Sequence, residues 1–286
     1  MIPVREVLNA AQKKLHDAGI GSARLDAQLI LCHYLKMPRS SLLANQDTSL
    51  DKTTVQKIFK TVYRRAKREP LAYIFEQKDF WEHRFIVSPD TLVPRPDSET
   101  LIEAVLNIVK SLQITPKKFF DLGTGSGCLL LSLLYEFQNS FGVALDISYR
   151  ACKIAQKNAL NLSLHKRTII INADWCSALN CLEKNDVVIC NPPYIDKANP
   201  DLLSPELMYE PETALYAKQN GLQAYKLLAS QLSYIVAHQG LVFFEIGFGQ
   251  KEDVTTLFTN QGFLLLKSFN DLQNIPRCLC FQKSNL

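Results

Sequence analysis

The sequence predicts an α/β protein in which a small helical region precedes a doubly wound, mostly parallel sheet of seven strands. From residue 117 onward, short apolar runs alternate with helical patterns, which is typical of a doubly wound sheet. The last two runs, at 264–269 and 278–282, are expected to close one edge of the sheet as a hairpin. The first five runs each end in a polar residue, so one rim of the sheet should be polar: Asp121, Asp146, Asn172, Asn191 and Glu245.

The first 70 residues are expected to form a small helical bundle. Apolar residues recur there every three or four positions, beginning at Val4, which favours amphipathic helices. A second helix begins after Ser22, a suitable N-cap, and a third begins near Lys52 and ends in the basic run 63–68. That run suits the negative end of the helix dipole, and contact with the phosphates of a partner fits it equally well. The apolar face of the second helix is predicted to consist of Leu25, Leu29, Cys32 and Leu35.

Residues 71–97 are predicted to connect the helical region, 1–70, to the sheet domain, 98–286. Residues 80–87 have the pattern of a β-hairpin. The loop 92–99 follows, in which Arg95 lies between two prolines, and a helix begins at Ser98. Because each proline fixes φ, this loop should be stiff, and we expect it to pack over a site.

The composition is that of an ordinary globular protein, with 47% hydrophobic residues, 21% charged residues and a net charge of +4. Eight cysteines are scattered without a Cys-x-x-Cys pair, so neither a metal site nor a disulfide framework is expected. A reducing, cytoplasmic location fits such cysteine usage best. The N-terminus does not resemble a signal peptide. The longest apolar run, 128–135, is too short to cross a bilayer, so no membrane association is expected.

The stretch around Asn191 has the features of a substrate-binding turn. Asn191-Pro192-Pro193-Tyr194 follows the apolar run 186–190, which is typical of a buried parallel strand. The two prolines end the strand at the edge where open α/β sheets bind their ligands. The Asn191 amide offers donors and an acceptor with which to orient a planar amide or amino group, and Tyr194 offers an aromatic face beside it. Taken alone, the tetrapeptide also fits a surface turn capped by Asn191.

A glycine-rich loop follows the first strand of the sheet, in the sequence Asp121-Leu122-Gly123-Thr124-Gly125-Ser126-Gly127. Glycines allow a sharp turn and a close approach of a ligand to main-chain N–H groups. Asp146 lies 21 residues after Gly125, just past the second strand, where a carboxylate can accept from both hydroxyls of a ribose. The spacing is Gly-x-Gly-x-Gly rather than the Gly-x-Gly-x-x-Gly of pyrophosphate sites. A nucleoside without phosphates is the better match, and S-adenosylmethionine is the common one.

Asp174 and Trp175 come directly after the third strand. Asp174 could accept from the amino group of adenine or belong to a capped turn, and both interpretations stay open. Trp175 is expected to stack on the adenine ring.

Six stretches of the sequence together resemble the bacterial peptide chain release factor glutamine methyltransferases over nearly the whole chain. The glycine-rich loop marks only the wider class of methyltransferases, and Asn-Pro-Pro-Tyr marks a nitrogen target. The proline-arginine-proline loop combined with a helical N-terminal region is much more specific, whereas residues 271–277 match loosely and are assigned to no site. The six stretches are 69–73, 80–81, 92–99, 121–127, 191–195 and 210–215.

The resemblance implies a Rossmann-like methyltransferase domain and a substrate-docking N-terminal domain. It implies transfer of a methyl group from S-adenosylmethionine to the side-chain amide nitrogen of the glutamine in the Gly-Gly-Gln motif of release factors, which modulates translation termination. The glycine loop would face the methionine part, Asp146 the ribose, Trp175 the adenine, and the 191–194 turn the glutamine amide. The predicted cofactor site comprises Gly123, Thr124, Gly125, Ser126, Gly127, Asp146, Asp174, Trp175 and Asn191. The predicted substrate site comprises Asn191, Pro192, Pro193 and Tyr194, of which Asn191, Pro192 and Tyr194 are the catalytic candidates.

Catalysis is expected to depend on positioning, because no acid–base pair is evident near Asn191. The Asn191 side-chain oxygen and the Pro192 carbonyl would accept from the glutamine amide, polarise its nitrogen and aim it at the sulfonium methyl. The proton can leave after methyl transfer, since an N-alkylated amide is strongly acidic. Tyr194 would wall the pocket and exclude water.

Three alternatives carry different substrates or none. A ribosomal-protein glutamine methyltransferase would share the chemistry, and residues 96–99 favour the release factor over it. A DNA adenine-N6 methyltransferase would flip a base onto the same turn, but only the N-terminal helices are available for target recognition. An intact 191–194 turn argues against a nucleoside-binding module without catalysis. The expected partner is therefore a release factor, with no nucleic-acid substrate, and the chain is expected to be a monomer.

Overall fold

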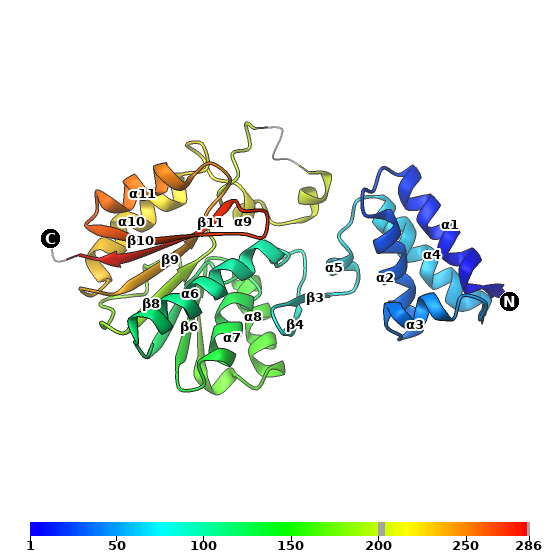
Figure 1. The fold of residues 1–286 in the computed structure, drawn as a ribbon, viewed down its shortest axis with the longest axis horizontal. Helices are drawn as coiled ribbons and strands as arrows, with labels where there is room; N and C mark the ends of the chain where they lie inside the picture. Colours follow the sequence, from blue (N-terminus) through cyan, green and yellow to red (C-terminus); the bar gives the residue numbers. More distant parts are fainter. Residues whose placement is uncertain (200–203, 285–286) are drawn as a thin grey trace. The chain divides into compact units, whose positions relative to one another are not determined.

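The computed structural model describes residues 1–199 and 204–284 and forms two compact units, Met1–Glu76 and Gln77–Leu286 (Figure 1). The first unit has one hydrophobic core of its own, and the second has two. Helix α5 (Leu71–Ile74) falls in the first unit, and the hairpin of β3 (Gln77–Phe80) and β4 (His83–Ile86) falls in the second. The sequence analysis, by contrast, sets residues 71–97 apart as a connecting segment. Within the described residues, no helix is both long and apolar enough to cross a membrane.

The first unit is built mainly from helices, as the apolar spacing predicts. Helix α4 begins after Asp51, whose carboxylate accepts from the backbone N–H of Thr54 at 2.9 Å and so caps the helix. Ser22 precedes the second helix without a side-chain capping bond. Two short strands, β1 (Ile2–Pro3) and β2 (Ser49–Leu50), pair antiparallel. The four longer helices of this unit are α1 (Val4–Asp17), α2 (Ala23–Leu35), α3 (Arg39–Ala44) and α4 (Lys52–Ala66).

The buried face of α2 differs from the predicted one. Leu25 and Leu29 are exposed, so this half of the predicted apolar face is wrong, whereas Cys32 and Leu35 pack against the core. Asp26 is buried beside the stripe that faces the core, where its carboxylate accepts from Arg65 Nε at 2.7 Å. A buried carboxylate needs such a partner, and this pair holds that stripe against α4. The apolar residues of α2 that enter the core are Ala23, Ala27, Ile30 and Leu31.

The basic run at the end of α4 is used inside the first unit. Arg64 Nε donates to the Glu69 carboxylate at 2.7 Å, and Arg65 forms the buried pair already described. Arg68 donates to the carbonyl of Gly19 at 2.9 Å, just after α1. These contacts favour the structural interpretation of the run over contact with phosphates.

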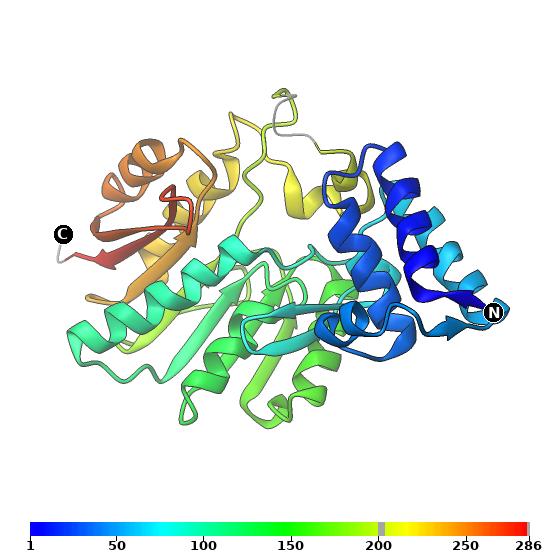
Figure 2. The same cartoon turned by 45° about the vertical axis from the view of Figure 1, so that its right-hand side comes forward.

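A seven-stranded sheet organises the second unit, and the predicted doubly wound fold is confirmed. The strand order is β10-β11-β9-β8-β5-β6-β7. Strand β11 is antiparallel to both of its neighbours, and the other pairs are parallel. In Figure 2 the orange and red strands β10 and β11 lie at one edge of the sheet. The strands are β5 (Lys118–Leu122), β6 (Phe141–Asp146), β7 (Thr168–Asn172), β8 (Asp186–Cys190), β9 (Leu241–Glu245), β10 (Phe263–Asn270) and β11 (Pro276–Lys283).

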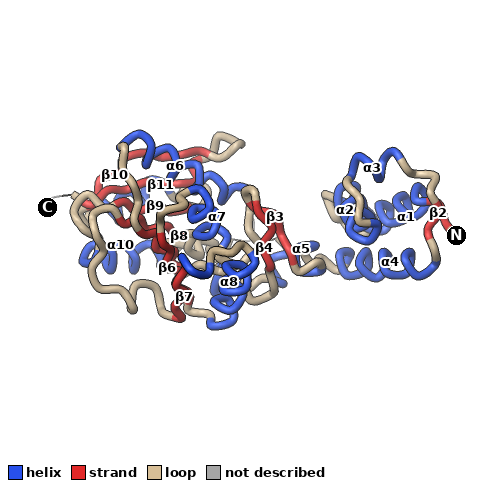
Figure 3. The backbone as a smooth tube through the Cα atoms, turned by 90° about the horizontal axis from the view of Figure 1, so that it is seen from below, coloured by secondary structure: helices blue, strands red, loops and turns tan. Residues whose placement is uncertain are grey.

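Helices cover both faces of this sheet, because successive strand residues point to opposite sides. Phe119 faces the core beneath α6 (Glu99–Leu112) and α7 (Cys128–Glu136), whereas Phe120 faces the core beneath α10 (Gln223–Ile235) and α11 (Lys251–Thr259). Figure 3 shows the strands between α6 and α7 on one side and α10 on the other. The buried strands β5, β8 and β9 read as continuous apolar runs for this reason.

The β3–β4 hairpin is tied to the sheet domain through Asn158 on α8 (Tyr149–Asn161). Asn158 Oδ1 accepts from the backbone N–H of Ile86 at 2.7 Å, and Nδ2 donates to the carbonyls of Ile86 and Ser126 at 2.9 and 2.8 Å. The backbone N–H of Trp81 donates to the Glu99 carboxylate at 2.8 Å, at the start of α6. One buried amide therefore links the hairpin to the glycine-rich loop.

Candidate active site

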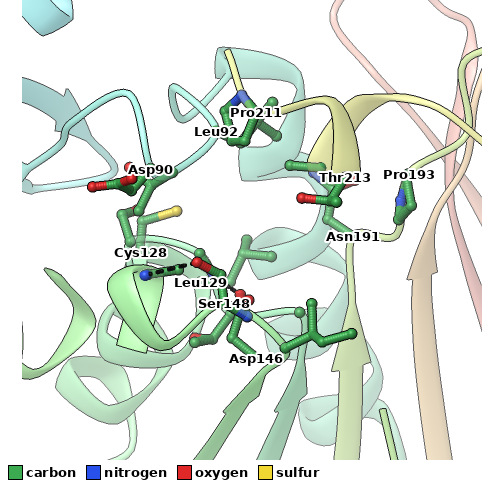
Figure 4. Close-up of a pocket in the computed structure, with 18 of the residues that line it drawn as sticks. Asp90, Leu92, Cys128, Leu129, Asp146, Ser148, Asn191, Pro193, Pro211 and Thr213 are labelled. Carbon is green, nitrogen blue, oxygen red and sulfur yellow. Dashed lines mark hydrogen bonds between the residues drawn. The ribbon is translucent and has the colours of Figure 1, made fainter. Parts of the chain in front are cut away.

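A cavity of about 330 Å³ opens at the carboxyl ends of β5, β6 and β8, the edge at which the sequence places the site (Figure 4). The loop after β5 and the end of β6 line one part of it. The turn after β8 lines another part, and the segments 90–94 and 211–216 also contribute. In the view of Figure 4, Asn191 and Thr213 lie on the opposite side from Asp90 and Cys128.

Two of the three loop glycines line this cavity. Gly123 and Gly125 have φ of +79° and +56°, a backbone region that favours glycine. A Cβ on Gly125 would meet nothing within 4 Å, so the loop leaves room for a ligand beside its main chain. Thr124 and Ser126 also line the cavity. Gly127, predicted to bind the cofactor, instead lies outside the lining, where a Cβ would press on helix side chains at 3.2 and 3.3 Å.

Asp146 joins the end of β6 to the glycine loop. Its Oδ2 accepts from Gly125 N–H and its Oδ1 accepts from Ser148 N–H, both at 2.8 Å. Burial raises the pKa of Asp146, and these two backbone donors oppose the rise. The carboxylate lines the cavity, and each oxygen retains a second lone pair for a ligand.

A second carboxyl group, Asp121, lies buried at the end of β5. Its Oδ2 accepts from the Thr124 hydroxyl at 2.6 Å, while Oδ1 is buried without a hydrogen-bond partner among the described residues. Burial raises the pKa of Asp121 to about 7, the Thr124 hydrogen bond opposes the rise, and the charge of Asp146 adds to it. A titratable buried group therefore lies directly beneath the glycine-rich loop.

The segment after β7 contributes the residues predicted to surround adenine. Asp174 and Trp175 both line the cavity, and Asp174 is exposed. A Cβ on Gly123 would lie 3.4 Å from the Trp175 ring, so the indole packs directly beside the glycine-rich loop. Asn172 Nδ2 donates to the carbonyls of Asp146 and Ile147 at 2.9 and 2.8 Å and so links the end of β7 to the end of β6.

Asn191 lies where the first cavity meets a second one. The second cavity is lined by Pro192, Tyr194 and Glu245, among others, whereas Pro193 faces the first. Asn191, Leu92 and Ala214 line both. The predicted substrate turn is thus divided between two adjoining spaces, with Asn191 at their junction.

Tyr194 is held in place from several directions. Its hydroxyl donates to Glu245 Oε1 at 3.0 Å, and its carbonyl accepts from Gln250 Nε2 at 3.1 Å. A Cβ on Gly221 would lie 2.1 Å from that carbonyl oxygen, so only glycine fits there. Burial raises the pKa of the Tyr194 phenol, and the neighbouring Glu245 charge raises it further. The phenol therefore stays neutral and forms part of the wall of the second cavity.

The loop 92–98 contributes to the site, as its prolines led us to expect. Leu92, Pro94 and Ser98 line the first cavity. The backbone N–H of Val93 donates to Glu210 at 3.0 Å, and the Arg95 guanidinium pairs with the same carboxylate. Residues 210–215, quoted above as a family motif, are thereby attached to this loop.

Several site residues were not predicted individually from the sequence. Glu245 was recognised only as the polar end of the fifth apolar run, and Ser98 only as the start of a helix. Arg277, in a segment assigned to no site, pairs with Asp271 at 3.0 Å and lies 3.6 Å from Asp97 of the 92–99 loop. Lining residues outside both the predicted site and the quoted stretches include Asp90, Ile147 and Tyr216.

Among the residues that the structure describes, the cavity has neither an activated cysteine nor a metal cluster. Cys128 lines it, but burial raises the pKa of that thiol to about 12. Among residues 1–199 and 204–284, no group of three or more His, Cys, Asp or Glu side chains is placed to hold a metal ion. The polar atoms at the junction are instead amide, hydroxyl and carboxylate groups suited to orienting a ligand.

Two family matches cover most of the chain. Residues 6–75 match the PrmC N-terminal domain, and residues 98–218 match the methyltransferase small domain. The first match lies within the helical unit and the second within the sheet unit.

Solved structures with similar folds are methyltransferases. The hMettl16 catalytic domain in complex with MAT2A 3′UTR hairpin 1 aligns with a TM-score of 0.55 at 15% identity, covering 84% of this chain and 85% of that one. A methyltransferase from Pyrococcus furiosus aligns with a TM-score of 0.53 at 15% identity, covering 78% and 98%. At such identities these matches support the fold alone.

Curated relatives extend over nearly the whole chain. A bifunctional methyltransferase of Rickettsia felis is 35% identical over 99% of this chain, which spans 58% of that longer protein. The release factor glutamine methyltransferase of Francisella tularensis subsp. tularensis is 35% identical, covering 97% of this chain and 96% of its own length. The enzyme of that name from Buchnera aphidicola subsp. Schizaphis graminum is 36% identical, covering 96% and 98%. The chain therefore belongs to the family of release factor glutamine methyltransferases.

Proposed function

We propose that this protein transfers a methyl group from S-adenosylmethionine to the side-chain amide nitrogen of the glutamine in the Gly-Gly-Gln motif of a peptide chain release factor. The observation that best supports this is the meeting of two cavities at Asn191. One is lined like a nucleoside site, and the other is available for a side chain of a protein substrate. Relatives that cover the chain almost end to end are named for this reaction.

The lining of the first cavity fits S-adenosylmethionine. Asp146 has a free lone pair on each oxygen with which to accept from the two ribose hydroxyls. Trp175 and Ile147 offer apolar surface to the adenine, and the open space beside Gly125 accommodates the methionine part. Asp121, beneath the loop, favours a cationic ligand when it is in its ionised form. The bound S-adenosylmethionine supplies the methyl group.

The residues at the junction would hold the glutamine amide. The Asn191 side-chain oxygen and the Pro192 carbonyl are the acceptors assigned to its two N–H bonds. Accepting both hydrogens increases the electron density on the nitrogen and orients its lone pair toward the first cavity. Tyr194 walls this position and excludes water. The effect required of these residues is positioning and electrostatic stabilisation.

No side chain is needed as a base before transfer. Tyr194 is neutral and donates to Glu245, so it does not take a proton. The N-alkylated amide is a strong acid once formed, and it loses its proton to bulk solvent as the product leaves the site. This supports the assignment of Asn191, Pro192 and Tyr194 as the residues that act on the substrate.

We assign docking of the release factor to the helical N-terminal unit. Its match to the PrmC N-terminal domain supports this assignment. DNA is a poorer candidate substrate, because Arg64, Arg65 and Arg68 of the basic run have partners within the unit. A ribosomal-protein glutamine remains the alternative with the same chemistry.

Methyl-labelled S-adenosylmethionine tests the proposal directly. The purified protein is incubated with release factor, with release factor in which the Gly-Gly-Gln glutamine is changed to alanine, with ribosomal protein and with DNA. We expect label in intact release factor alone. Equal label in the alanine variant would place the target elsewhere, and label in ribosomal protein or DNA would assign the chain to one of the alternatives.

A further inference from the structure

The Asn191 side chain has a neighbour that distinguishes its two ends. Its Nδ2 donates to the hydroxyl oxygen of Ser98 at 3.2 Å, across 93 residues of sequence. An amide has a donor end and an acceptor end of nearly equal size, so its orientation depends on its hydrogen-bond partners. Whether the Ser98 hydroxyl accepts from Asn191 or donates to it therefore decides which end of the Asn191 amide faces the cavities.

Ser98 is itself constrained by Glu245. The serine is buried at the junction of η1 (Pro96–Ser98) and α6, and it has a single hydroxyl proton. Glu245 lies at the end of β9 with only 1% of its surface exposed. Burial raises the pKa of Glu245, and the nearby Ser98 hydroxyl, the Tyr194 hydroxyl and the charge of Arg277 oppose the rise.

The two carboxylate oxygens of Glu245 differ in the hydrogen bonds that they accept. Oε1 accepts from the Tyr194 hydroxyl at 3.0 Å. Oε2 is buried and has no hydrogen bond of good geometry from the described residues. The Ser98 hydroxyl, which rotates freely about its C–O bond, is the neighbouring donor that can turn toward this carboxylate. A buried carboxylate left without donors would be costly.

This arrangement sets the direction of the whole chain of hydrogen bonds. Asn191 Nδ2 donates to the Ser98 oxygen, so the single Ser98 proton points away from Asn191 and is free to turn toward the Glu245 carboxylate. The Ser98 oxygen is then left as an acceptor, and Asn191 must present its NH₂ group to it. The reverse orientation would place the Asn191 oxygen against an oxygen whose proton is already used. The Asn191 oxygen is consequently the end left for the cavity junction.

We propose that Ser98 and Glu245 are positioning residues that keep the Asn191 amide turned with its oxygen toward the substrate, so that Asn191 acts as an acceptor for the substrate N–H. This deepens the proposed function and rests on it for the identity of the substrate. It also assigns the donor group of Asn191 to Ser98 rather than to the carbonyl of the substrate glutamine.

Three serine variants test the proposal. Ser98→Ala removes the acceptor for Asn191, and Ser98→Thr keeps a hydroxyl in the same place. Ser132→Ala is the matched control, because Ser132 is a fully buried serine on α7 whose hydroxyl has no partner in the described chain. Thermal unfolding of each variant checks that the protein is folded.

We expect kcat for release factor to fall by about 10²-fold in Ser98→Ala, the scale of a misplaced reacting group. Cofactor affinity should stay within about twofold of wild type, since a positioning role separates kcat from binding. Ser98→Thr should recover most of the lost rate, and Ser132→Ala should match wild type. A folded Ser98→Ala protein with wild-type kcat would overturn the proposal.

A measurement on the side-chain amide keeps this test independent of the substrate. The ¹H–¹⁵N signal of the Asn191 side chain can be assigned by its absence from Asn191→Asp. Its solvent exchange should speed up in both Ser98→Ala and Glu245→Gln and stay unchanged in Ser132→Ala. An unchanged signal in Ser98→Ala would refute the inference even if release factor is methylated. A changed signal with no methylation of release factor would refute only the proposed function.

Discussion

Arg95 and Glu210 are 115 residues apart in sequence, yet their side chains form an ion pair beside the second cavity, which Arg95 lines. The Glu210 carboxylate is fully buried, and it also accepts from the backbone N–H of Val93. One carboxylate thus holds the 92–98 loop to the 204–215 segment. Both segments line the cavities at which Asn191 is placed.

Replacing Glu210 with Ala should loosen the attachment of the 92–98 loop to the 204–215 segment. The change leaves the Val93 N–H and part of the Arg95 guanidinium without a partner, which should cost roughly 1–3 kcal/mol in unfolding free energy. We expect cofactor affinity and methyl transfer to fall together, because the loop lines both cavities. Urea unfolding and calorimetric titration with S-adenosylmethionine measure the two effects.

Glu212→Ala provides the control for this change. Glu212 lies two residues away, and its side chain is 72% exposed where it pairs with Lys197. Exposed pairs contribute less than about 1 kcal/mol, so this variant should resemble wild type. Equal behaviour of the two variants would show that the Glu210 contacts do not hold the loop.

Replacing Asp146 with Ala should weaken cofactor binding. The carboxylate supports the Gly125 and Ser148 N–H groups and keeps lone pairs for the ribose, so its loss should cost roughly 1–3 kcal/mol in binding free energy. Asp174→Ala, at an exposed position in the same cavity, should cost less. Calorimetry compares the cofactor affinities of the two variants. A larger loss of affinity in Asp174→Ala than in Asp146→Ala would make Asp174 the main polar contact of the cofactor.

Asp121 should make folding stability depend on pH. Its pKa is about 7 in the folded protein, against an ordinary value of 3.8 for the aspartate side chain, so the folded state binds more protons between these pH values. Stability contributed by this group is therefore greatest at low pH and falls as pH rises toward 7, by at most about 1.4 kcal/mol per pH unit. Asp121→Asn should lack this component.

Urea unfolding of wild type and Asp121→Asn from pH 5 to pH 8 checks the sign. The unfolding free energy of the variant, relative to wild type, should rise with pH. Only the slope of this difference is diagnostic, since the substitution also changes the hydrogen bond from Thr124. Parallel curves would mean that the Asp121 carboxyl does not titrate in this range.

Substitutions of Asn191 should stop methyl transfer. Asn191→Ala removes the acceptor assigned to the substrate, and cofactor affinity should remain largely intact. In Asn191→Asp, the new carboxylate and Glu245 would compete for the single Ser98 proton, which twists the side chain from its position. We expect a loss of about 10²–10³ in single-turnover rate for the Asp variant. Near wild-type turnover by Asn191→Ala would remove this turn from the reaction.

Removal of the helical unit should separate cofactor binding from substrate use. A chain beginning at Gln77 keeps both cores of the sheet unit and every predicted cofactor residue. It should bind S-adenosylmethionine with an affinity close to that of the full chain and methylate intact release factor poorly. A short peptide containing Gly-Gly-Gln serves as the control, because it needs no docking and should be used equally by both proteins. Full activity of the shortened chain on release factor would place docking in the sheet unit.

The sequence by itself determined the features that depend on local periodicity and on the geometry of individual residue types. Alternation of apolar runs with helical patterns specified the sheet and its polar rim, because a parallel strand must be buried on both faces. Glycine spacing specified the turn after β5, and consecutive prolines specified where β8 ends. Asp146 and Asn191 could be named because they follow such strands.

The tertiary structure alone decided which distant residues meet. No periodicity relates Ser98 to Asn191, Tyr194 to Glu245 or Val93 to Glu210, which are 93, 51 and 117 residues apart. These pairs depend on strand order and on loops that cross the edge of the sheet. The buried face of α2 was decided in the same way, because its helix offers two apolar stripes and the Asp26–Arg65 pair selects one of them. Local sequence restricts the conformation of each segment, whereas the partners of its polar groups are chosen only when distant segments are buried together.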